Sequence, residues 1–149
     1  MTLDPVGFVR NEVTEARDED WGGVVSELRL LPQYAGGLQG LDGFSHAVIV
    51  FLMHHAVFQS QAHLQRRPRD RDDMPLLGIF AQRARHRPNP IGTTTVRIES
   101  VTGSSLFVRG LDAIDGTPVL DIKPHVPVFD APDAPNVPEW MGRLMRGYF

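Results

Sequence analysis

Glycine and proline recur so often along this chain that long, uninterrupted helices are excluded. The 149 residues include 14 glycines and 12 prolines, a combined share well above the ~12% of ordinary globular proteins. Both residues interrupt helices and mark turns, because glycine adopts backbone conformations closed to other residues and proline lacks a backbone N–H group. The segments between them are short, so the sequence favours many short strands.

Several of these segments carry the apolar patterns of β-strands. Residues 44–53 form the strongest, because the uninterrupted apolar stretch from Ala47 to Met53 is typical of a central strand buried on both faces. The other expected strands are residues 6–10, 24–31, 76–82, 91–101, 105–111 and 118–122. Six or seven short strands without alternating long helices predict a mainly all-β fold, either a barrel or a sandwich.

The remaining segments are polar or rich in proline. Residues 59–75 are polar and arginine-rich, which predicts an exposed loop with a short helix at most. Irregular proline-rich connections are expected after residue 122, with one short helix at 138–145. No linker divides the chain, so residues 1–149 are expected to form a single domain.

Several classes of function are disfavoured by what the sequence lacks. Cysteine is absent, which excludes disulfides, thiolate metal sites and cysteine nucleophiles within these residues. No apolar run approaches the ~20 residues of a membrane helix, and the first residues lack the features of a secretory signal. A cytoplasmic protein without membrane contact is therefore expected. The glycine patterns of the P-loop and of dinucleotide-binding sites are also missing.

Positive charge is concentrated in one segment. The net charge of −3 gives no overall sign of nucleic-acid binding. Of the 15 cationic residues, however, 14 are arginines, and seven of these lie between Arg66 and Arg87. The whole-chain average therefore conceals a basic segment.

The end of this segment is a rigid loop. It carries Arg83, Arg85 and Arg87, and prolines on both sides of Asn89 fix the backbone there. Guanidinium groups held in defined directions suit the recognition of carboxylates or phosphates. We expect this loop to be part of the functional site.

A second candidate is the carboxylate of Asp121, which lies between the apolar residues Leu120 and Ile122. Its side chain is expected at a partly buried site, where a catalytic role is possible. An ion pair with Lys123, the only lysine of the chain, explains the same residues equally well.

His54 and His55 follow the central strand. Adjacent residues on a strand point to opposite faces, so the pair cannot chelate one ion unless the strand has ended. His46 lies eight residues before His54, ~26 Å along an extended strand. No metal site is therefore expected, whereas one histidine of the pair is expected to line a pocket at the strand end.

Three ordered segments resemble the TsaA-like family. They are GLDGFSHAVIVFLMHH (40–55), GIFAQRARHRPNPIG (78–92) and DGTPVLDIKPH (115–125), within a resemblance that runs from Val6 to about Pro127. The best-known members are TrmO-type methyltransferases, which use S-adenosylmethionine to methylate N6 of threonylcarbamoyladenosine 37 in tRNA. The resemblance implies a small single-domain β-barrel that binds this cofactor, acts on tRNA and works as a homodimer with the cofactor near the subunit interface.

The resemblance also assigns site residues. It places the cofactor against Gly22, Gly23 and Val24, against His54 and His55, against Arg83 and Thr93, and against Arg109, Gly110, Leu111 and Asp112. Arg83 suits the methionine carboxylate and Asp112 the ribose hydroxyls. Contacts with the substrate are expected from Arg85, Arg87, Asn89 and Lys123. Asp121 or a pocket histidine is the candidate to take the proton of the acceptor.

Other functions stay open at this point. The better-studied tRNA enzymes of the family carry an additional C-terminal domain, which is not expected in residues 1–149. A methyltransferase of the same build that acts on a small molecule or another RNA is one alternative. A non-catalytic, S-adenosylmethionine-binding regulatory barrel is the other.

Overall fold

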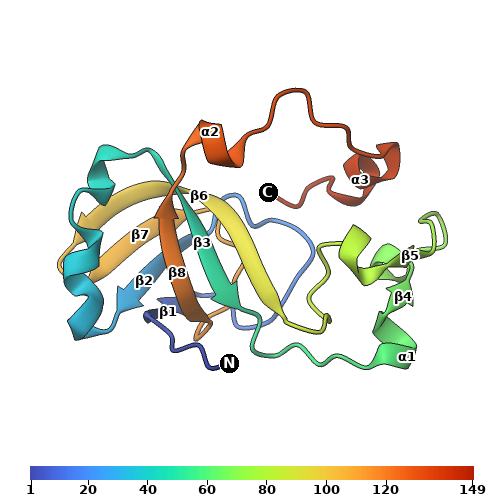
Figure 1. Cartoon of the computed structure of the whole chain (residues 1–149), viewed down its shortest axis with the longest axis horizontal. Coiled ribbons are helices and arrows are strands. Elements are labelled where there is room, and N and C mark those ends of the chain that lie inside the picture. The colour runs from blue at the N-terminus through green and yellow to red at the C-terminus, as the bar shows by residue number, and fades with distance from the viewer.

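The computed structural model describes all residues from Met1 to Phe149 and contains a closed barrel of six antiparallel strands (Figure 1). Around the barrel the strands follow the order β1-β2-β7-β6-β3-β8. Their bounds are β1 Gly7–Arg10, β2 Val25–Leu30, β3 His46–Leu52, β6 Ile91–Thr102, β7 Ser105–Arg109 and β8 Pro118–Pro124. The expectation of a mainly β-barrel fold is thus confirmed.

Short helices and a two-stranded ribbon complete the chain. The α-helices are α1 (Ser60–His63), α2 (Pro127–Asp130) and α3 (Glu139–Leu144). The 3-10 helices are η1 (Pro32–Leu38), η2 (Leu41–Gly43), η3 (Pro68–Asp70) and η4 (Ile79–Ala81), and the ribbon pairs β4 (Gln65–Arg66) with β5 (Leu77–Gly78). None of these helices has the length and apolar character needed to cross a bilayer.

Alternating side chains of the strands fill the barrel. On β3, the inward side chains of Ala47, Ile49 and Phe51 are buried, whereas the outward Val48 and Val50 are half-buried. β3 pairs with β6 on one side and β8 on the other, as a central strand should. The apolar stretch therefore serves the core with one face and leaves an apolar stripe on the outer surface.

Two turns need glycine for a conformational reason. Gly103 has a φ of 60° in the hairpin between β6 and β7, and Gly116 has a φ of 80° before β8. Residues with a Cβ atom rarely adopt such left-handed conformations. The turn at Gly103 joins the strands expected at residues 91–101 and 105–111.

The barrel closes through a short seam between β1 and β8. Only Gly7 with Val119 and Phe8 with Pro118 are paired there, whereas β3 and β6 pair over seven residues. Backbone hydrogen bonds flank this pairing: the Val6 N–H donates to the Val119 carbonyl (2.8 Å), the Val9 N–H to the Thr117 carbonyl (2.9 Å) and the Gly116 N–H to the Val9 carbonyl (2.8 Å).

The prediction of a strand at residues 76–82 is wrong for most of these residues. Only Leu77 and Gly78 are extended, and the chain then turns through η4. The cause is Gln82, a buried side chain whose Nε2 donates to the carbonyls of Arg66 (2.9 Å) and Leu77 (3.0 Å). These bonds fold the segment back on itself, so a side chain replaces the strand ladder.

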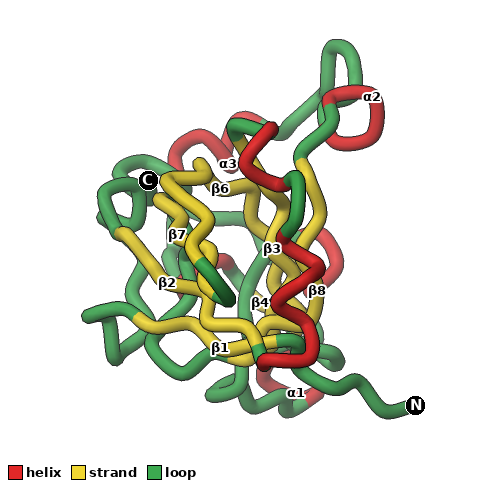
Figure 2. The backbone as a smooth tube through the Cα atoms, turned by 90° about the vertical axis from the view of Figure 1, so that its left-hand side faces the viewer, coloured by secondary structure: helices red, strands yellow, loops and turns green.

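Beyond β8 the chain leaves the barrel as an arm of residues 125–138 that carries α2 (Figure 2). Val128 and Phe129 on this arm are more than four-fifths exposed. After the arm, α3 and the last residues return to the barrel (Figure 1). The expected irregular connection and the short helix near residues 138–145 are both present.

Candidate cofactor site

Two segments far apart in the sequence meet at one end of the barrel. The Gly110 N–H donates to the Val24 carbonyl at 2.9 Å, and Arg109 Nη1 donates to the Gly23 carbonyl at 3.3 Å. Gly110 has a φ of 89°, a conformation that favours glycine at this crossing. The structure therefore brings residues 22–24 and 109–112 together, as the resemblance implies.

Asp112 is the chemical centre of this group. Its Oδ1 accepts a hydrogen bond from the Thr94 hydroxyl, and its Oδ2 accepts one from the Tyr148 hydroxyl at 2.5 Å. Thr94 is buried on the inner face of β6. Burial and the negative charge of Asp112 raise the pKa of Tyr148 well above its usual value, so the phenol remains a donor. A carboxylate that accepts two hydroxyl groups is chemically suited to a ribose diol.

Arg83 lies on the other side of the same strand. Its Nη2 donates to the Thr93 carbonyl at 2.5 Å and lies 3.2 Å from the Thr93 hydroxyl. Thr93 is exposed whereas Thr94 is buried, because neighbouring strand residues point to opposite faces. Arg83 and Asp112 are thus close along β6 but lie on opposite faces of it.

His54 and His55 lie just beyond the end of β3. The strand ends at Leu52, and the two exposed rings contact each other with their centroids 4.1 Å apart. Partial burial and the neighbouring His55 lower the pKa of His54. Because the strand has ended, the opposed directions expected for adjacent residues no longer apply. No group of three or more His, Asp or Glu side chains is placed to hold a metal ion.

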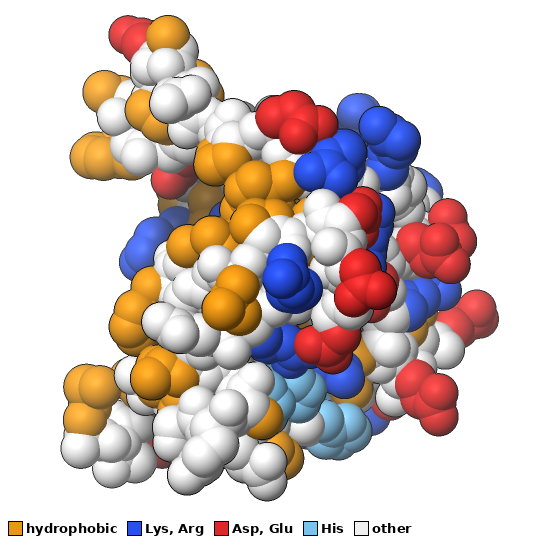
Figure 3. Space-filling view, turned by 90° about the vertical axis from the view of Figure 1, so that its right-hand side faces the viewer, with side chains coloured by type: hydrophobic (Ala, Val, Ile, Leu, Met, Phe, Trp, Pro, Cys, Tyr) orange, Lys and Arg blue, Asp and Glu red, His pale blue; other side chains and the backbone are white.

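The arginine loop, the rigid loop with Arg83, Arg85 and Arg87, carries most of the positive charge of the basic segment that no carboxylate neutralises. Arg66, Arg69 and Arg71 form ion pairs with carboxylates, whereas Arg83 and Arg85 form none. Figure 3 shows Lys and Arg side chains gathered beside histidines on this face. Arg67 is the other arginine of the segment without a carboxylate partner, so the positive charge that an anion meets comes mainly from the loop.

Arg87 has a different place from Arg85. Its Nη1 donates to the carbonyls of Gln82 (3.0 Å) and Ala84 (3.3 Å), so this side chain closes the loop from within. Arg85 and Asn89 are exposed, and Nε of Arg85 lies 3.1 Å from Nε2 of His86. Of the loop residues assigned to the substrate, Arg87 is the one that the structure places in a supporting position.

A stacked pair of histidines borders the loop. The rings of His63 and His86 are nearly parallel, with centroids 4.8 Å apart. Nδ1 of His86 accepts a hydrogen bond from the Val57 N–H (3.0 Å), and Nδ1 of His63 accepts one from the Gln59 N–H (2.9 Å). Both bonds require an unprotonated Nδ1, so neutral rings tie the chain around α1 to the arginine loop.

Lowering the pH through the histidine range should therefore destabilise the protein. Burial, Arg85 and His63 lower the pKa of His86, so the unfolded chain takes up a proton at a higher pH than the folded one. Stability should fall from the ordinary histidine pKa of about 6.5 down to the lowered value. Thermal unfolding between about pH 7.5 and 5.5 measures this slope. His86→Asn keeps an acceptor for Val57 and should flatten the slope, and equal slopes would contradict the assignment.

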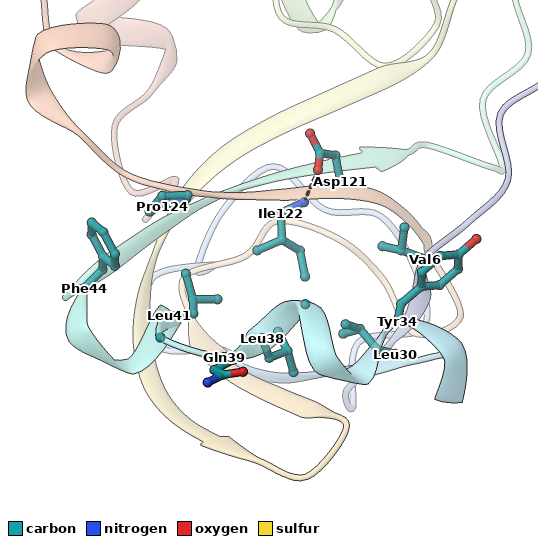
Figure 4. A pocket seen from close by; sticks show the side chains of 12 residues that line it. Val6, Leu30, Tyr34, Leu38, Gln39, Leu41, Phe44, Asp121, Ile122 and Pro124 are labelled. Carbon is teal, nitrogen blue, oxygen red and sulfur yellow. Dashed lines mark hydrogen bonds between the residues drawn. The ribbon is translucent and has the colours of Figure 1, made fainter.

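Asp121 lies outside this group. Its carboxylate pairs with Lys123, and both side chains are at least 46% exposed. The residue borders an open, mainly apolar pocket of about 370 Å³, but the carboxylate points away from the apolar side chains and accepts the Ile122 N–H at 2.9 Å (Figure 4). The ion pair between Asp121 and Lys123, the explanation expected as an alternative to a catalytic role, is present. On the outer face, Asp121 and Thr93 both pair with Val50, from opposite sides.

The sequence of this chain matches a known family. The profile described as the tRNA-methyltransferase O N-terminal domain matches residues 18–131. The chain belongs to this family. The tRNA-methyltransferase O proteins are S-adenosylmethionine-dependent methyltransferases, which agrees with the TsaA-like resemblance of the three segments.

Individual members of the tRNA-methyltransferase O family are similar over most of the chain. A putative S-adenosylmethionine-dependent methyltransferase, RcsF, from Pseudomonas aeruginosa is 37% identical, across 91% of this chain and 59% of its own length. A probable S-adenosyl-L-methionine-binding protein from Methanothermobacter thermautotrophicus is 36% identical, across 88% of this chain and 94% of its own length. The crystal structure of TrmO from Pseudomonas aeruginosa superposes with a TM-score of 0.73 at 35% identity, covering 91% of this chain and 60% of that one. The chain thus spans about 60% of the Pseudomonas proteins.

Two residues of the site are not predicted from the sequence. Thr94 and Tyr148 both donate to Asp112, from 18 and 36 residues away. Tyr148 also lies beyond the part of the chain that matches the family. The alternation along β6 was a signal that Thr94 faces inward, whereas no pattern marks Tyr148.

Proposed function

We propose that this chain is an S-adenosylmethionine-dependent methyltransferase that methylates N6 of threonylcarbamoyladenosine 37 in tRNA, as a cytoplasmic homodimer. The observation that carries the cofactor assignment is the meeting of residues 22–24 with residues 109–112 around Asp112. The acceptor is supported by relatives such as the human tRNA (adenine(37)-N6)-methyltransferase, 41% identical over 98 residues, which cover 64% of this chain and 21% of that protein.

The residues present fit the cofactor chemically. When bound, S-adenosylmethionine supplies a methyl group on a positively charged sulfur. Asp112 would hold the ribose hydroxyls, and the backbone of Gly22 and Gly23 would allow close approach because no side chain intervenes. Arg83 would pair with the methionine carboxylate from the outer face of β6. The contribution of the protein is alignment and exclusion of water, which supply about 7–11 kcal/mol in favourable cases.

The acceptor must also lose a proton. Asp121 is the proposed base, because its carboxylate lies on the outer face of the barrel on the far side of β3 from Thr93. Its carboxylate pairs with Lys123 and is 46% exposed, so an incoming nucleotide has access to it. Lys123 would then lie beside the incoming nucleotide.

The arginine loop is the proposed contact with the tRNA backbone. Arg85 is exposed and has no carboxylate partner, so its charge is available to a phosphate. Arg87 supports that position through its bonds to Gln82 and Ala84. The rings of His63 and His86 border the loop and offer flat surfaces of the kind on which bases stack.

The outer stripe of β3 supports a homodimer. Val48, Val50 and Leu52 are half-buried on this face, and the neighbouring Ile91 is 40% exposed. An apolar stripe between charged residues is typical of a protein–protein interface. A second copy covering it would lie next to Arg83, Thr93 and Asp121.

Transfer of labelled methyl groups to tRNA tests the proposal. The acceptor is tRNA from cells that lack this modification, incubated with labelled S-adenosylmethionine. Arg85→Ala should lower kcat/KM by about tenfold or more, because a hydrogen bond to a charged group contributes about 1.5–3 kcal/mol. Arg97→Ala is the matched control, since Arg97 is also exposed without a carboxylate partner but lies opposite His46 on β6.

The pattern of labelling separates the alternatives. Label on position 37 that falls only in the Arg85 variant supports the proposal. Label on another RNA or on a small molecule would show that the proposed acceptor is wrong, while the assignment as a methyltransferase would stand. Cofactor binding without transfer to any acceptor would favour a regulatory barrel.

A further inference from the structure

The last three residues of the chain lie along the segment that precedes Gly22. The Asp20 N–H donates to the Gly147 carbonyl (2.9 Å) and the Trp21 N–H to the Tyr148 carbonyl (2.8 Å). The indole of Trp21 is 2% exposed and anchors this side of the contact. We name residues 147–149 the Tyr148 strap; Figure 1 shows it returning to the barrel after α3.

The strap covers the backbone of Gly22. A methyl group added to Gly22 would lie 2.5 Å from the backbone carbon C of Phe149, so the two backbones are already in close contact. Because Gly22 has no side chain, a ligand could approach its backbone closely. In this structure the strap occupies that space instead.

The side chain of Tyr148 fixes the strap over Asp112. Its hydroxyl donates to Asp112 Oδ2 at 2.5 Å, and its ring lies under the guanidinium of Arg69 at 5.8 Å. Arg69 in turn lies 3.7 Å from Asp18, on the segment that leads to Trp21. The strap is therefore held by backbone bonds, a half-buried phenol and a cation above the ring.

The two donors to Asp112 differ in how easily they can leave. Thr94 belongs to β6, in the wall of the barrel, and is buried. Tyr148 belongs to a three-residue segment outside the barrel strands. A ligand hydroxyl can therefore reach Asp112 most easily at Oδ2, where it would replace the phenol.

We propose that the Tyr148 strap occupies part of the cofactor site, with the Tyr148 hydroxyl in the place of a ribose hydroxyl on Asp112. The proposal rests on the assignment of Asp112 to the ribose under the proposed function. Cofactor binding then requires that the strap move off Gly22 and Asp112. Molecules with a closed strap do not bind the cofactor. The apparent Kd is therefore the Kd of the open form divided by the fraction of molecules in which the strap is open.

Weakening the strap should therefore tighten cofactor binding. Tyr148→Phe removes the donor to Asp112 and keeps the ring below Arg69. Titration calorimetry with S-adenosylmethionine should give a Kd about three- to tenfold lower for this variant, the factor by which the fraction of molecules with an open strap rises. Tyr34→Phe is the control, because Tyr34 is 41% exposed and lies on η1, outside the proposed site.

A second measurement follows the strap directly. In a Trp140→Phe background, Trp21 is the only tryptophan and reports on the backbone bond to Tyr148. Adding S-adenosylmethionine should change its emission as the strap leaves, and Tyr148→Phe should already shift the emission of the cofactor-free protein towards that state.

The outcomes separate the strap from the proposed function. Tighter binding in Tyr148→Phe, with Tyr34→Phe unchanged, supports the strap. Unchanged or weaker binding in Tyr148→Phe, while the wild type binds, overturns the strap and leaves the cofactor assignment standing. No binding by any of the three proteins overturns the proposed function itself.

Discussion

Gly92→Ala should lower the free energy of unfolding by about 1–3 kcal/mol, the cost of overpacking a core. A methyl group on Gly92 would lie 2.5 Å from Cε2 of Phe51, whose ring is 3% exposed in the barrel core. The ring cannot retreat without displacing its neighbours, because protein interiors are close-packed. Gly92 is the residue that pairs with Phe51 between β6 and β3, so the strain falls directly on the strand that carries Thr93 and Thr94.

Denaturant unfolding of Gly92→Ala measures this effect. Gly142→Ala is the matched control: Gly142 lies in α3 with open space around its Cα, and alanine favours helices. In a Phe51→Leu background, Gly92→Ala should lower the free energy of unfolding by less than it does in the wild type. Additive effects of the two substitutions would show that the ring contact is not the cause.

Asp112→Asn should weaken S-adenosylmethionine binding by about 10- to 100-fold, since hydrogen bonds to a charged group contribute about 1.5–3 kcal/mol. The substitution keeps an oxygen for Thr94, and the Tyr148 hydroxyl can accept from the new amide. The fold should thus be retained while the negative charge offered to the ribose is lost. Calorimetric titration together with a thermal unfolding curve separates the two effects.

Asp115→Asn provides the comparison for this variant. Asp115 accepts the Asn11 N–H at 3.1 Å and lies 3.9 Å from Arg10, in the turn before β8. Loss of the same charge there should leave cofactor affinity unchanged. A Kd of Asp112→Asn within threefold of the wild type would remove Asp112 from the cofactor site.

The sequence predicts those parts of the fold that are encoded locally. Apolar patterns indicated β2, β3 and β6, and the frequent glycines indicated short strands joined by turns, such as those at Gly103 and Gly116. The failure at residues 76–82 has a physical cause: the bonds of Gln82 depend on carbonyls at Arg66 and Leu77, and no periodic pattern reports them.

The candidate site was only partly predictable for the same reason. The family resemblance predicted that residues 22–24 lie near residues 109–112. It did not predict the donors to Asp112, which lie on β6 and on the Tyr148 strap and reach Asp112 only in the folded chain. The direction of a loop side chain also has no periodic signal, so Arg87 gave no indication that it bonds the loop carbonyls instead of facing outward.

The short seam between β1 and β8 has a consequence for how the barrel opens. With two paired positions and three flanking backbone hydrogen bonds, this is the shortest join between neighbouring strands of the barrel, and amides of β1 should exchange with solvent before those of β3. Parting the ring would expose the edges of two strands, each a template for pairing with another molecule. The few contacts that hold β1 to β8 therefore also guard the protein against edge-to-edge aggregation.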